Sequence, residues 1–339
     1  MRKSLFGVTL ALCAALCACS KPPEKLVVYT AAEADQLPAY ATSFRQAHPE
    51  IALVWVRDST GIVTAKLLAE SKAEQADVVF ALAATSMMQL DAAGLLDSYA
   101  PKGVERLDAR FRDGRATPHW TGEALWTAAV CVNTEEARKH NLPLPTSWED
   151  LTKPAYRGMI EMPNPASSGT GLLAVAAWLQ IMGEPKGWAY MDRLNQNIAT
   201  YVHSGSKPCK DAARGEIPIG ISIDFRAAQA KAQGLPVAIV TPSEGLGWDL
   251  EATGLVKGAR HAAAAKAFID WAMSPAAMRI YAQNFALVAD PTVPNPPPNL
   301  PRDLKNRLAP VSLKWTADNR QRIIDAWSAR YAVKSEPKG

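Results

Sequence analysis

Two short polar loops, each at the expected start of a helix, have the residue types of an anion site. The first is Asn164–Gly171, in which three hydroxyl residues and two glycines precede an apolar run. The second is Asp58–Gly61, between the strand-like segment 51–57 and the helix-like segment 62–70. Backbone N–H groups, hydroxyl donors and the positive end of the helix dipole converge at such a helix start. Two loops of this kind, far apart in sequence, predict two lobes that close on one anionic ligand.

Ordinary helix capping is the alternative interpretation of these hydroxyl groups. One cap would explain one residue, but not three hydroxyl residues together with two glycines and a matching loop elsewhere in the chain. We therefore assign ligand contact to the residues of both loops, while Ser86 fits a binding role and a structural role equally well. The loop residues assigned to the ligand are Ser59, Thr60, Ser167, Ser168, Gly169 and Thr170.

Elements of alternating type must position these loops. Strand-like segments at 26–30, 51–57 and 77–81 are each followed by a helix-like segment. This βα alternation predicts an α/β fold with a parallel sheet covered by helices on both faces. Ligands of such sheets bind beyond the carboxyl ends of the strands, where the loops that begin at Ala31, Asp58 and Ala83 would lie.

Two strand-like segments, Thr127–Asn133 and Trp248–Val256, are expected to connect the lobes. Lobe one would comprise residues 26–130 and 251–339, the latter ending in C-terminal helices, and lobe two residues 131–250. The ligand cleft would lie between the lobes.

The N-terminus has the pattern of an export signal. A charged start precedes the apolar Leu5–Leu16, which is too short to span a bilayer, so residues 1–18 are expected to be removed. The following segment is similar to a bacterial lipobox with Cys19 as the lipidated residue, although Cys17 is an unusual occupant of that motif. Free secretion is the alternative. Residues 19–25 would form a polar tether between the membrane and the domain.

Charge and composition exclude several classes of protein. Loss of Arg2 and Lys3 lowers the basic count from 37 to 35 against 33 acidic residues, a net charge of +2. The chain has no basic block and no RNA-binding aromatic motif, which argues against nucleic acid as a partner. After the signal region no apolar run is long enough to span a membrane.

Two cysteines, Cys131 and Cys209, remain after the signal region. In an oxidising compartment they are candidates for a disulfide, and two buried thiols that never meet are the alternative. Cys131 falls in the first predicted crossover and Cys209 opens a helix of lobe two. A bond between them would brace the hinge.

Several motifs together resemble the type II periplasmic solute-binding proteins of ABC importers. The resemblance implies two α/β lobes joined by two crossover strands, a ligand held between them, delivery to permease subunits of the inner membrane, a monomeric state and neither cofactor nor enzymatic activity. The motifs that carry it are Val28–Ala31, Asp58–Gly61, Leu82–Ser86, Pro165–Gly171, Gly205-Ser206, Ala213–Glu216 and Ile221–Asp224.

A narrower resemblance points to the 2-aminoethylphosphonate-binding proteins. It rests on Trp55–Gly61, Met162–Gly171, His203–Cys209 and Gly245–Thr253. Relatives on the same scaffold bind ferric ion, phosphate esters such as hexose phosphates, polyamines or thiamine, so those ligand classes stay open. The ferric branch places adjacent tyrosines where this chain has Asp224-Phe225, and the five histidines are scattered, so no metal site is expected.

A zwitterionic phosphonate needs hydrogen-bond donors at one end and a carboxylate at the other. We expect the loop hydroxyls to bind the phosphonate, with His203 as a further donor, and Asp224 to bind the ammonium, with Asp249 and Glu33 as alternatives. Phe225, Tyr29 and Trp248 could offer an aromatic face to the cation. The predicted ligand-binding residues are Thr30, Glu33, Ser59, Thr60, Ala84, Ser86, Ser167, Ser168, Gly169, Thr170, Asp224 and Phe225.

A periplasmic serine hydrolase is the competing interpretation from another class of protein. Ser204–Lys207 matches the S-x-x-K motif of serine β-lactamases, but neither S-D-N nor K-T-G follows it. The chain also lacks a G-x-S-x-G elbow, a P-loop and an H-E-x-x-H motif. The remaining tryptophans, Trp126 among them, are expected to pack in the core or the hinge.

Overall fold

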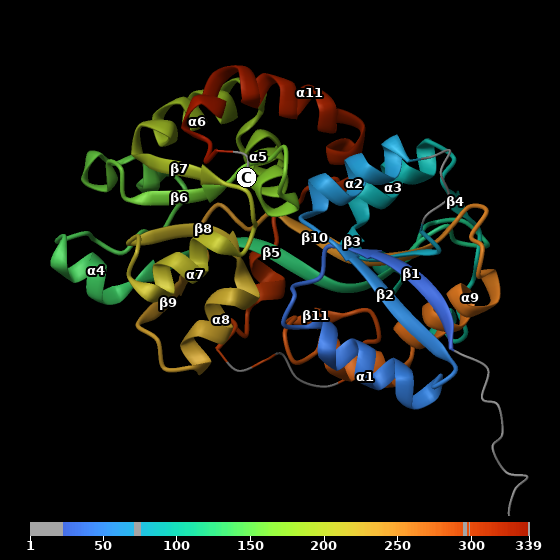
Figure 1. Cartoon of the computed structure of the whole chain (residues 1–339). Coiled ribbons are helices and arrows are strands. Elements are labelled where there is room, and N and C mark those ends of the chain that lie inside the picture. The colour runs from blue at the N-terminus through green and yellow to red at the C-terminus, as the bar shows by residue number, and fades with distance from the viewer. Residues whose placement is uncertain (1–22, 71–75, 294–296, 298, 338–339) are drawn as a thin grey trace, which may run out of the picture.

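The computed structural model describes residues 23–70, 76–293, 297 and 299–337. Two α/β lobes lie side by side, as Figure 1 shows, and one continuous sheet path, β2-β1-β3-β10-β5-β8-β6-β7, passes through both. The two-lobe α/β fold expected from the sequence is confirmed.

Lobe one is built on a parallel sheet extended by an antiparallel strand. Strand β1 pairs in parallel with β2 and β3, and β10 pairs antiparallel with β3. β3 is buried along its whole length, as its uninterrupted apolar sequence predicts for a strand covered on both faces. The elements are β1 (Glu24–Thr30), α1 (Leu37–Ala47), β2 (Ile51–Arg57), α2 (Thr60–Ala69), β3 (Val78–Ala83), α3 (Ala84–Ala92), β4 (Leu96–Asp97), β10 (Trp248–Val256), α9 (Ala262–Ala272), α10 (Pro275–Tyr281) and β11 (Leu287–Val288).

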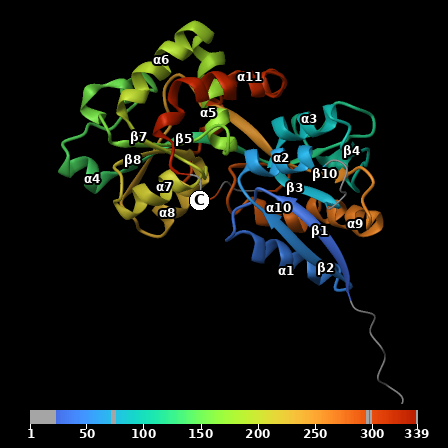
Figure 2. The ribbon, with the colours of Figure 1, turned by 45° about the horizontal axis from the view of Figure 1, so that its top comes forward.

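Lobe two repeats this layering with different helices. Strand β6 pairs in parallel with β7 and β8, helices α5 and α6 lie on one face of the sheet, and α7 and α8 lie on the other (Figures 1 and 2). Helix α5 is apolar on all sides and buried from Gly169 to Leu179, which makes it the central helix of this lobe. The elements are α4 (Thr134–Lys139), β6 (Ile160–Pro163), α5 (Gly169–Met182), α6 (Glu184–Asn197), β7 (Ile198–Val202), α7 (Lys207–Arg214), β8 (Ile219–Ile223), α8 (Asp224–Ala232) and β9 (Val237–Val240).

The long strand β5 (Thr121–Asn133) belongs to both lobes. It pairs with β10 up to Thr127 and with β8 from Ala128 onwards, so the chain passes from lobe one to lobe two between these two residues. The return lies between the end of β9 and the start of β10. The first crossing lies at the start of the expected segment Thr127–Asn133, whereas the return precedes the expected segment Trp248–Val256, which lies wholly in lobe one.

The C-terminal helix α11 (Leu313–Tyr331) does not stay in lobe one, to which the sequence analysis assigned residues 251–339. It crosses the top of the molecule between α3 and α5 (Figure 2). The Trp327 ring packs edge-on against Tyr201 of β7, and the Tyr331 hydroxyl donates to Asp192 of α6 at 2.6 Å. Aromatic burial and these polar contacts therefore attach the end of the chain to lobe two.

The expected tether overlaps the first strand, because β1 already begins at Glu24. The signal segment 1–18 and Cys19 lie outside the described residues. Within the part of the chain that the structure describes, no helix combines the length and the apolar character needed to cross a membrane.

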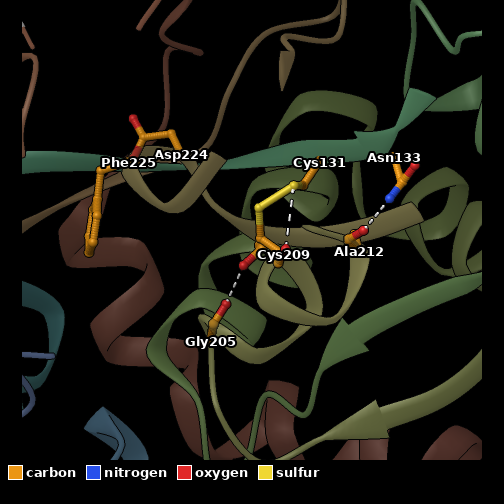
Figure 3. Close-up of a disulfide and its surroundings, with 8 residues drawn as sticks. Cys131, Asn133, Gly205, Cys209, Ala212, Asp224 and Phe225 are labelled. Atoms are coloured by element: carbon orange, nitrogen blue, oxygen red, sulfur yellow. Dashed lines mark hydrogen bonds between the residues drawn. A yellow bond between two sulfur atoms is a disulfide. The ribbon is translucent and has the colours of Figure 1, made fainter. Parts of the chain in front are cut away.

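Cys131 and Cys209 are joined by a disulfide with their Cα atoms 5.4 Å apart (Figure 3). Cys131 lies on the part of β5 that pairs with β8 and β9, and Cys209 lies in the first turn of α7. The bond therefore fixes α7 to the sheet inside lobe two. It does not brace the hinge, which corrects the expectation from the sequence.

Candidate functional site

A small cavity of about 40 Å³ lies between the lobes. Its walls come from the ends of strands and the starts of helices in both lobes, where the topology of a parallel sheet places ligand sites. The lining residues are Ala31, Glu33, Gln36, Arg57, Ser59, Thr60, Trp126 and Glu251 from lobe one, and Ser168, Gly169, Thr170, Ser204, Gly205, Ser206, Ile223 and Phe225 from lobe two.

The lobe-one wall includes the start of α2. Ser59 occupies the N-cap position, yet its side chain makes no capping hydrogen bond, so its hydroxyl group is not used by the helix. Thr60 follows as the first helical residue. The capping interpretation therefore does not account for Ser59, whereas a ligand at the positive end of the helix would use both hydroxyl groups.

The lobe-two wall is formed by the starts of α5 and α7. Ser168 caps α5 by accepting a 3.3 Å hydrogen bond from the Gly171 N–H, and its hydroxyl can still donate to a ligand. A side chain at Gly169 would place its Cβ 2.8 Å from the Thr60 hydroxyl oxygen, and one at Gly205 would come within 2.9 Å of the Ser168 hydroxyl oxygen. Glycine is thus required for the hydroxyl groups of both lobes to meet at one point.

The cleft is closed, and hydrogen bonds join the two walls. The Gly61 N–H donates to the Ser167 carbonyl oxygen at 2.8 Å, and a Cβ at Gly61 would overlap the Ala166 carbonyl oxygen. Nearby, the His203 Nε2 atom lies 2.9 Å from the Asp58 carboxylate, and both side chains are exposed. His203 is therefore an interlobe contact at the surface and is not among the lining residues.

A buried arginine connects the lobes beside the cavity. Arg226 of α8 donates to Glu33 at 2.7 Å and to Asp35 at 2.6 Å, and Ser206 donates to the same Glu33 carboxylate at 3.1 Å. Burial alone would raise the pKa of Glu33, but the charges of Arg226 and Lys210 outweigh it and hold that pKa below its usual value. Glu33 is thus an ionised carboxylate that is already paired.

Asp224, the residue expected to bind an ammonium group, does not line the cavity. Its carboxylate accepts a hydrogen bond from the Phe225 N–H at 2.9 Å, and burial raises its pKa to about 6. The side chains of Asp224 and Phe225 point in different directions (Figure 3). Of these two residues, Phe225 is the one that lines the cavity. The alternative candidate Asp249 is buried too and accepts a 2.7 Å hydrogen bond from Thr85.

Four other predicted residues also lie behind the wall of the cavity. Thr30 accepts a hydrogen bond from the Ala32 N–H, and Ser167 donates to the His203 carbonyl oxygen at 2.9 Å. Ala84 and Ser86 are fully buried in the first turn of α3. These residues support the loops without lining the cavity. The predicted residues that the structure brings to the cavity are Glu33, Ser59, Thr60, Ser168, Gly169, Thr170 and Phe225.

The sequence analysis missed several lining residues. Arg57 ends β2, and its Nε donates to the Ala32 carbonyl oxygen at 2.8 Å while the guanidinium group faces the cavity. Trp126 and Glu251 lie within β5 and β10, where strand periodicity predicts core packing. Two acidic residues, Asp249 and Glu251, in a mostly apolar strand were the available signal, because charged residues seldom lie within the core without a reason.

The site can bind a small anion through neutral donors. The backbone N–H groups of Thr60, Gly169 and Thr170 have no hydrogen-bond partner among the described residues. Together with the hydroxyl groups and Arg57 they form a donor-rich wall, while Glu33 and Glu251 add carboxyl groups. Over the same described ranges, no three or more His, Cys, Asp or Glu side chains cluster to hold a metal ion.

Comparison with known proteins identifies the family to which this chain belongs. Residues 73–313 match the model of the bacterial extracellular solute-binding proteins. An uncharacterised protein of Haemophilus influenzae is 32% identical over 253 residues, which are 74% of this chain and 73% of that protein. A probable ABC transporter periplasmic-binding protein of Sinorhizobium fredii is 27% identical over 282 residues, covering 77% and 73%.

Solved structures agree with this relationship. The periplasmic binding protein AfuA of Actinobacillus pleuropneumoniae, with fructose 6-phosphate bound, is 29% identical at a TM-score of 0.85, covering 91% of this chain and 99% of AfuA. These relatives are solute-binding proteins rather than enzymes, which confirms the expectation that the chain is not an enzyme. The chain belongs to the bacterial extracellular solute-binding proteins and is the periplasmic solute-binding component of an ABC transporter.

Proposed function

We propose that the protein captures 2-aminoethylphosphonate and delivers it to its permease. The observation that carries this proposal is the composition of the cavity wall. Hydroxyl groups and free N–H groups at helix starts, with Arg57, suit a phosphonate, and carboxyl groups in the same cavity suit an ammonium. A ligand that carries both charges on a short chain matches this set of groups.

The size of the closed cavity favours a short ligand. Its volume of about 40 Å³ exceeds the roughly 10–15 Å³ that one water needs, and it leaves little room for a sugar ring. The walls already touch through the Gly61–Ser167 and Arg226–Glu33 contacts, so the lobes close tightly around this space.

A sugar phosphate is the second candidate, favoured by the likeness to AfuA with fructose 6-phosphate bound. Such a ligand would use the same donor-rich wall for its phosphate group. It would also need the lobes to close less far than they do here, because the sugar ring would lie where Phe225 and Trp126 now face the cavity.

The proposed transport cycle follows from the two crossings. Opening at Thr127–Ala128 and at the return before β10 would separate the walls and admit the ligand. Closure would complete the shell of donors and present one joined surface to the permease. We further propose that Cys19 carries a lipid anchor. Mass spectrometry of the mature N-terminus tests it, and an unmodified terminus at another residue would rule it out.

Calorimetry with the mature protein distinguishes the candidate ligands. We expect 2-aminoethylphosphonate to bind more tightly than fructose 6-phosphate, inorganic phosphate, ethylphosphonate or putrescine. Clear binding of fructose 6-phosphate with no heat from the phosphonate would reject the proposal in favour of the second candidate.

A further inference from the structure

Of the two carboxyl groups that line the cavity, only one has a partner. Glu33 is held by Arg226, Ser206 and Lys210 at 2.7, 3.1 and 3.3 Å. No hydrogen bond or ion pair joins the carboxyl group of Glu251 to another described residue. Glu251 is half-buried, and an unpaired, partly desolvated carboxyl group at a ligand cavity can take a partner that the ligand supplies.

The sheet leaves the Glu251 side chain open to the cavity. Glu251 lies on β10 between Ala83 of β3 and Ala124 of β5, so both neighbours across the ladder are small. Trp126, two residues along β5 from Ala124, also lines the cavity. Its buried Nε1 atom has no hydrogen-bond partner, and neither does the buried Nε2 atom of Gln36 in the same wall. Both atoms are N–H donors, so they mark this wall as a surface that binds an acceptor atom of the ligand, while the Glu251 carboxyl group is the acceptor available to an ammonium.

The charged groups around Glu251 are predominantly acidic. Glu123 faces it from β5, Asp249 from β10 and Glu33 from the loop after β1. Two tyrosines lie behind this cluster, Tyr40 on α1 and Tyr281 on α10. Neither cation at the cavity pairs with Glu251: Arg226 pairs with Glu33 and Asp35, and Arg57 lies 4.0 Å from Glu33. A cation entering beside Glu251 would therefore meet several carboxyl groups and no fixed cation of its own.

We propose that Glu251 is the residue that binds the cationic end of the ligand and makes the receptor selective for phosphonates that carry a primary ammonium group. This inference rests on the proposed function and adds a specificity-determining residue to it. Trp126 lies on the neighbouring strand and adds an indole that can face the same cation. Glu251, in the middle of β10, thus takes the ammonium-binding role that the sequence analysis assigned to Asp224.

Proton release is a consequence specific to this arrangement. Burial raises the pKa of Glu251 well above its usual value, and the nearby Glu123, Asp249 and Glu33 raise it further. An ammonium group at the carboxyl oxygens would lower that pKa again, so the group would lose its proton when the ligand binds. Affinity for the ammonium ligand should then fall as the pH falls, because protonated Glu251 must first ionise.

The test measures 2-aminoethylphosphonate and ethylphosphonate, which differ by the amine, on the wild type, Glu251→Gln and the control Glu105→Gln, a change at an exposed glutamate. We expect Glu251→Gln to weaken 2-aminoethylphosphonate by about 10- to 100-fold, the loss of one charged hydrogen bond, and to leave ethylphosphonate unchanged. Calorimetry in buffers of different ionisation enthalpy should also show fewer protons released by 2-aminoethylphosphonate from this variant than from the wild type. Thermal melting checks that the variants fold.

The outcomes separate the two proposals. A wild type that prefers the amine-bearing ligand, with a Glu251→Gln variant that keeps the same preference and proton release, would overturn the role of Glu251 and leave the proposed function standing. A wild type that binds neither phosphonate would overturn both. If the glutamine variant does not fold, Glu251→Asp takes its place, because a shorter carboxylate should weaken only the amine-bearing ligand.

Discussion

The two lobes contribute different chemistry to the same cavity. Lobe one supplies every ionisable lining residue, namely Glu33, Arg57 and Glu251. Lobe two supplies hydroxyl groups, glycine backbone and apolar side chains, such as Ser168, Gly205 and Phe225. The difference indicates a division of labour. Lobe one would select a ligand by charge while the cleft is open, and lobe two would complete the hydrogen bonds when the cleft closes.

The largest expected effect comes from breaking the link between the buried Arg226 of lobe two and the carboxylates of Glu33 and Asp35 in lobe one. Arg226→Met would remove the closest cation of the half-buried Glu33 and leave it Lys210 at 3.3 Å and Arg57 at 4.0 Å, which should cost about 3 kcal/mol, the lower end for a buried pair that loses one member. Because the contact exists only in the closed form, ligand affinity and compaction on binding should both suffer. Small-angle scattering with and without ligand measures the compaction. A variant that closes like the wild type would show that the link does not govern closure.

Removing the disulfide should affect lobe two alone. Replacing Cys131 and Cys209 by alanine should lower the free energy of unfolding by about 2–4 kcal/mol, because the bond closes a long loop within that lobe. Hydrogen exchange should then rise in α7 and β8 and stay unchanged in β1 and β3. Faster exchange throughout lobe one would indicate that the bond supports both lobes.

Substitution of Asp224 tests whether a charged residue of lobe two binds the ligand. Its folded pKa of about 6 lies above its ordinary value of 3.8, so the folded state loses stability as the pH rises from about 4 to about 6. Asp224→Asn should therefore raise the free energy of unfolding by up to about 3 kcal/mol at pH 7.5 and change it little below pH 4. Urea denaturation across this range measures the difference.

The Asp224→Asn variant also tests which ligand the protein prefers. Because Asp224 does not line the cavity, the preference for 2-aminoethylphosphonate over ethylphosphonate should equal that of the wild type. A selective loss of the amine-bearing ligand would return the ammonium site to Asp224.

The hydroxyl groups should behave alike in the two lobes. Thr60→Val in lobe one and Thr170→Val in lobe two keep the side-chain shape and remove one donor each. Each should weaken both phosphonates by about 1–3 kcal/mol, because a buried acceptor loses its partner. Calorimetry with 2-aminoethylphosphonate and ethylphosphonate measures the loss of affinity for each ligand in each variant. Unequal losses would mean that these hydroxyl groups distinguish the amine.

The surface contact between the lobes should matter least. Asp58 and His203 are both exposed, so Asp58→Asn should change ligand affinity by less than about 1 kcal/mol. Doubling the salt concentration in the binding assay should reduce even this difference. A tenfold loss of affinity would instead show that this surface contact stabilises the closed form.

The sequence was informative where function depends on local structure. Ser59, Thr60 and Ser168–Thr170 were predicted as ligand contacts because a polar loop before an apolar helix is visible along the chain, and they line the cavity. The crossing in β5 is visible in the sequence as a long strand-like run between alternating units, whereas β10, the second expected crossing, stays within lobe one and the return precedes it. Both signals are local, and neither needs knowledge of which strands are neighbours.

The residues that were missed depend on lateral neighbours. Glu251 reaches the cavity because β10 lies between β3 and β5, with an alanine on either side of Glu251. The periodicity of a strand does not reveal which strands lie beside it. Asp224 was correctly placed at the end of a strand, but its buried carboxylate bonds to the backbone at the start of α8 and does not line the cavity. Helix α11 joins lobe two through Trp327 and Tyr331, whose partners lie far away in sequence.

A crystal structure of the mature protein with 2-aminoethylphosphonate tests the division of labour most directly. We predict that the phosphonate oxygens lie between the starts of α2 and α5, within hydrogen-bond distance of the Thr60 and Thr170 hydroxyl groups, and that the ammonium nitrogen lies against the Glu251 carboxylate. A ligand bound in the opposite orientation, or with its ammonium on a carboxylate of lobe two, would contradict it.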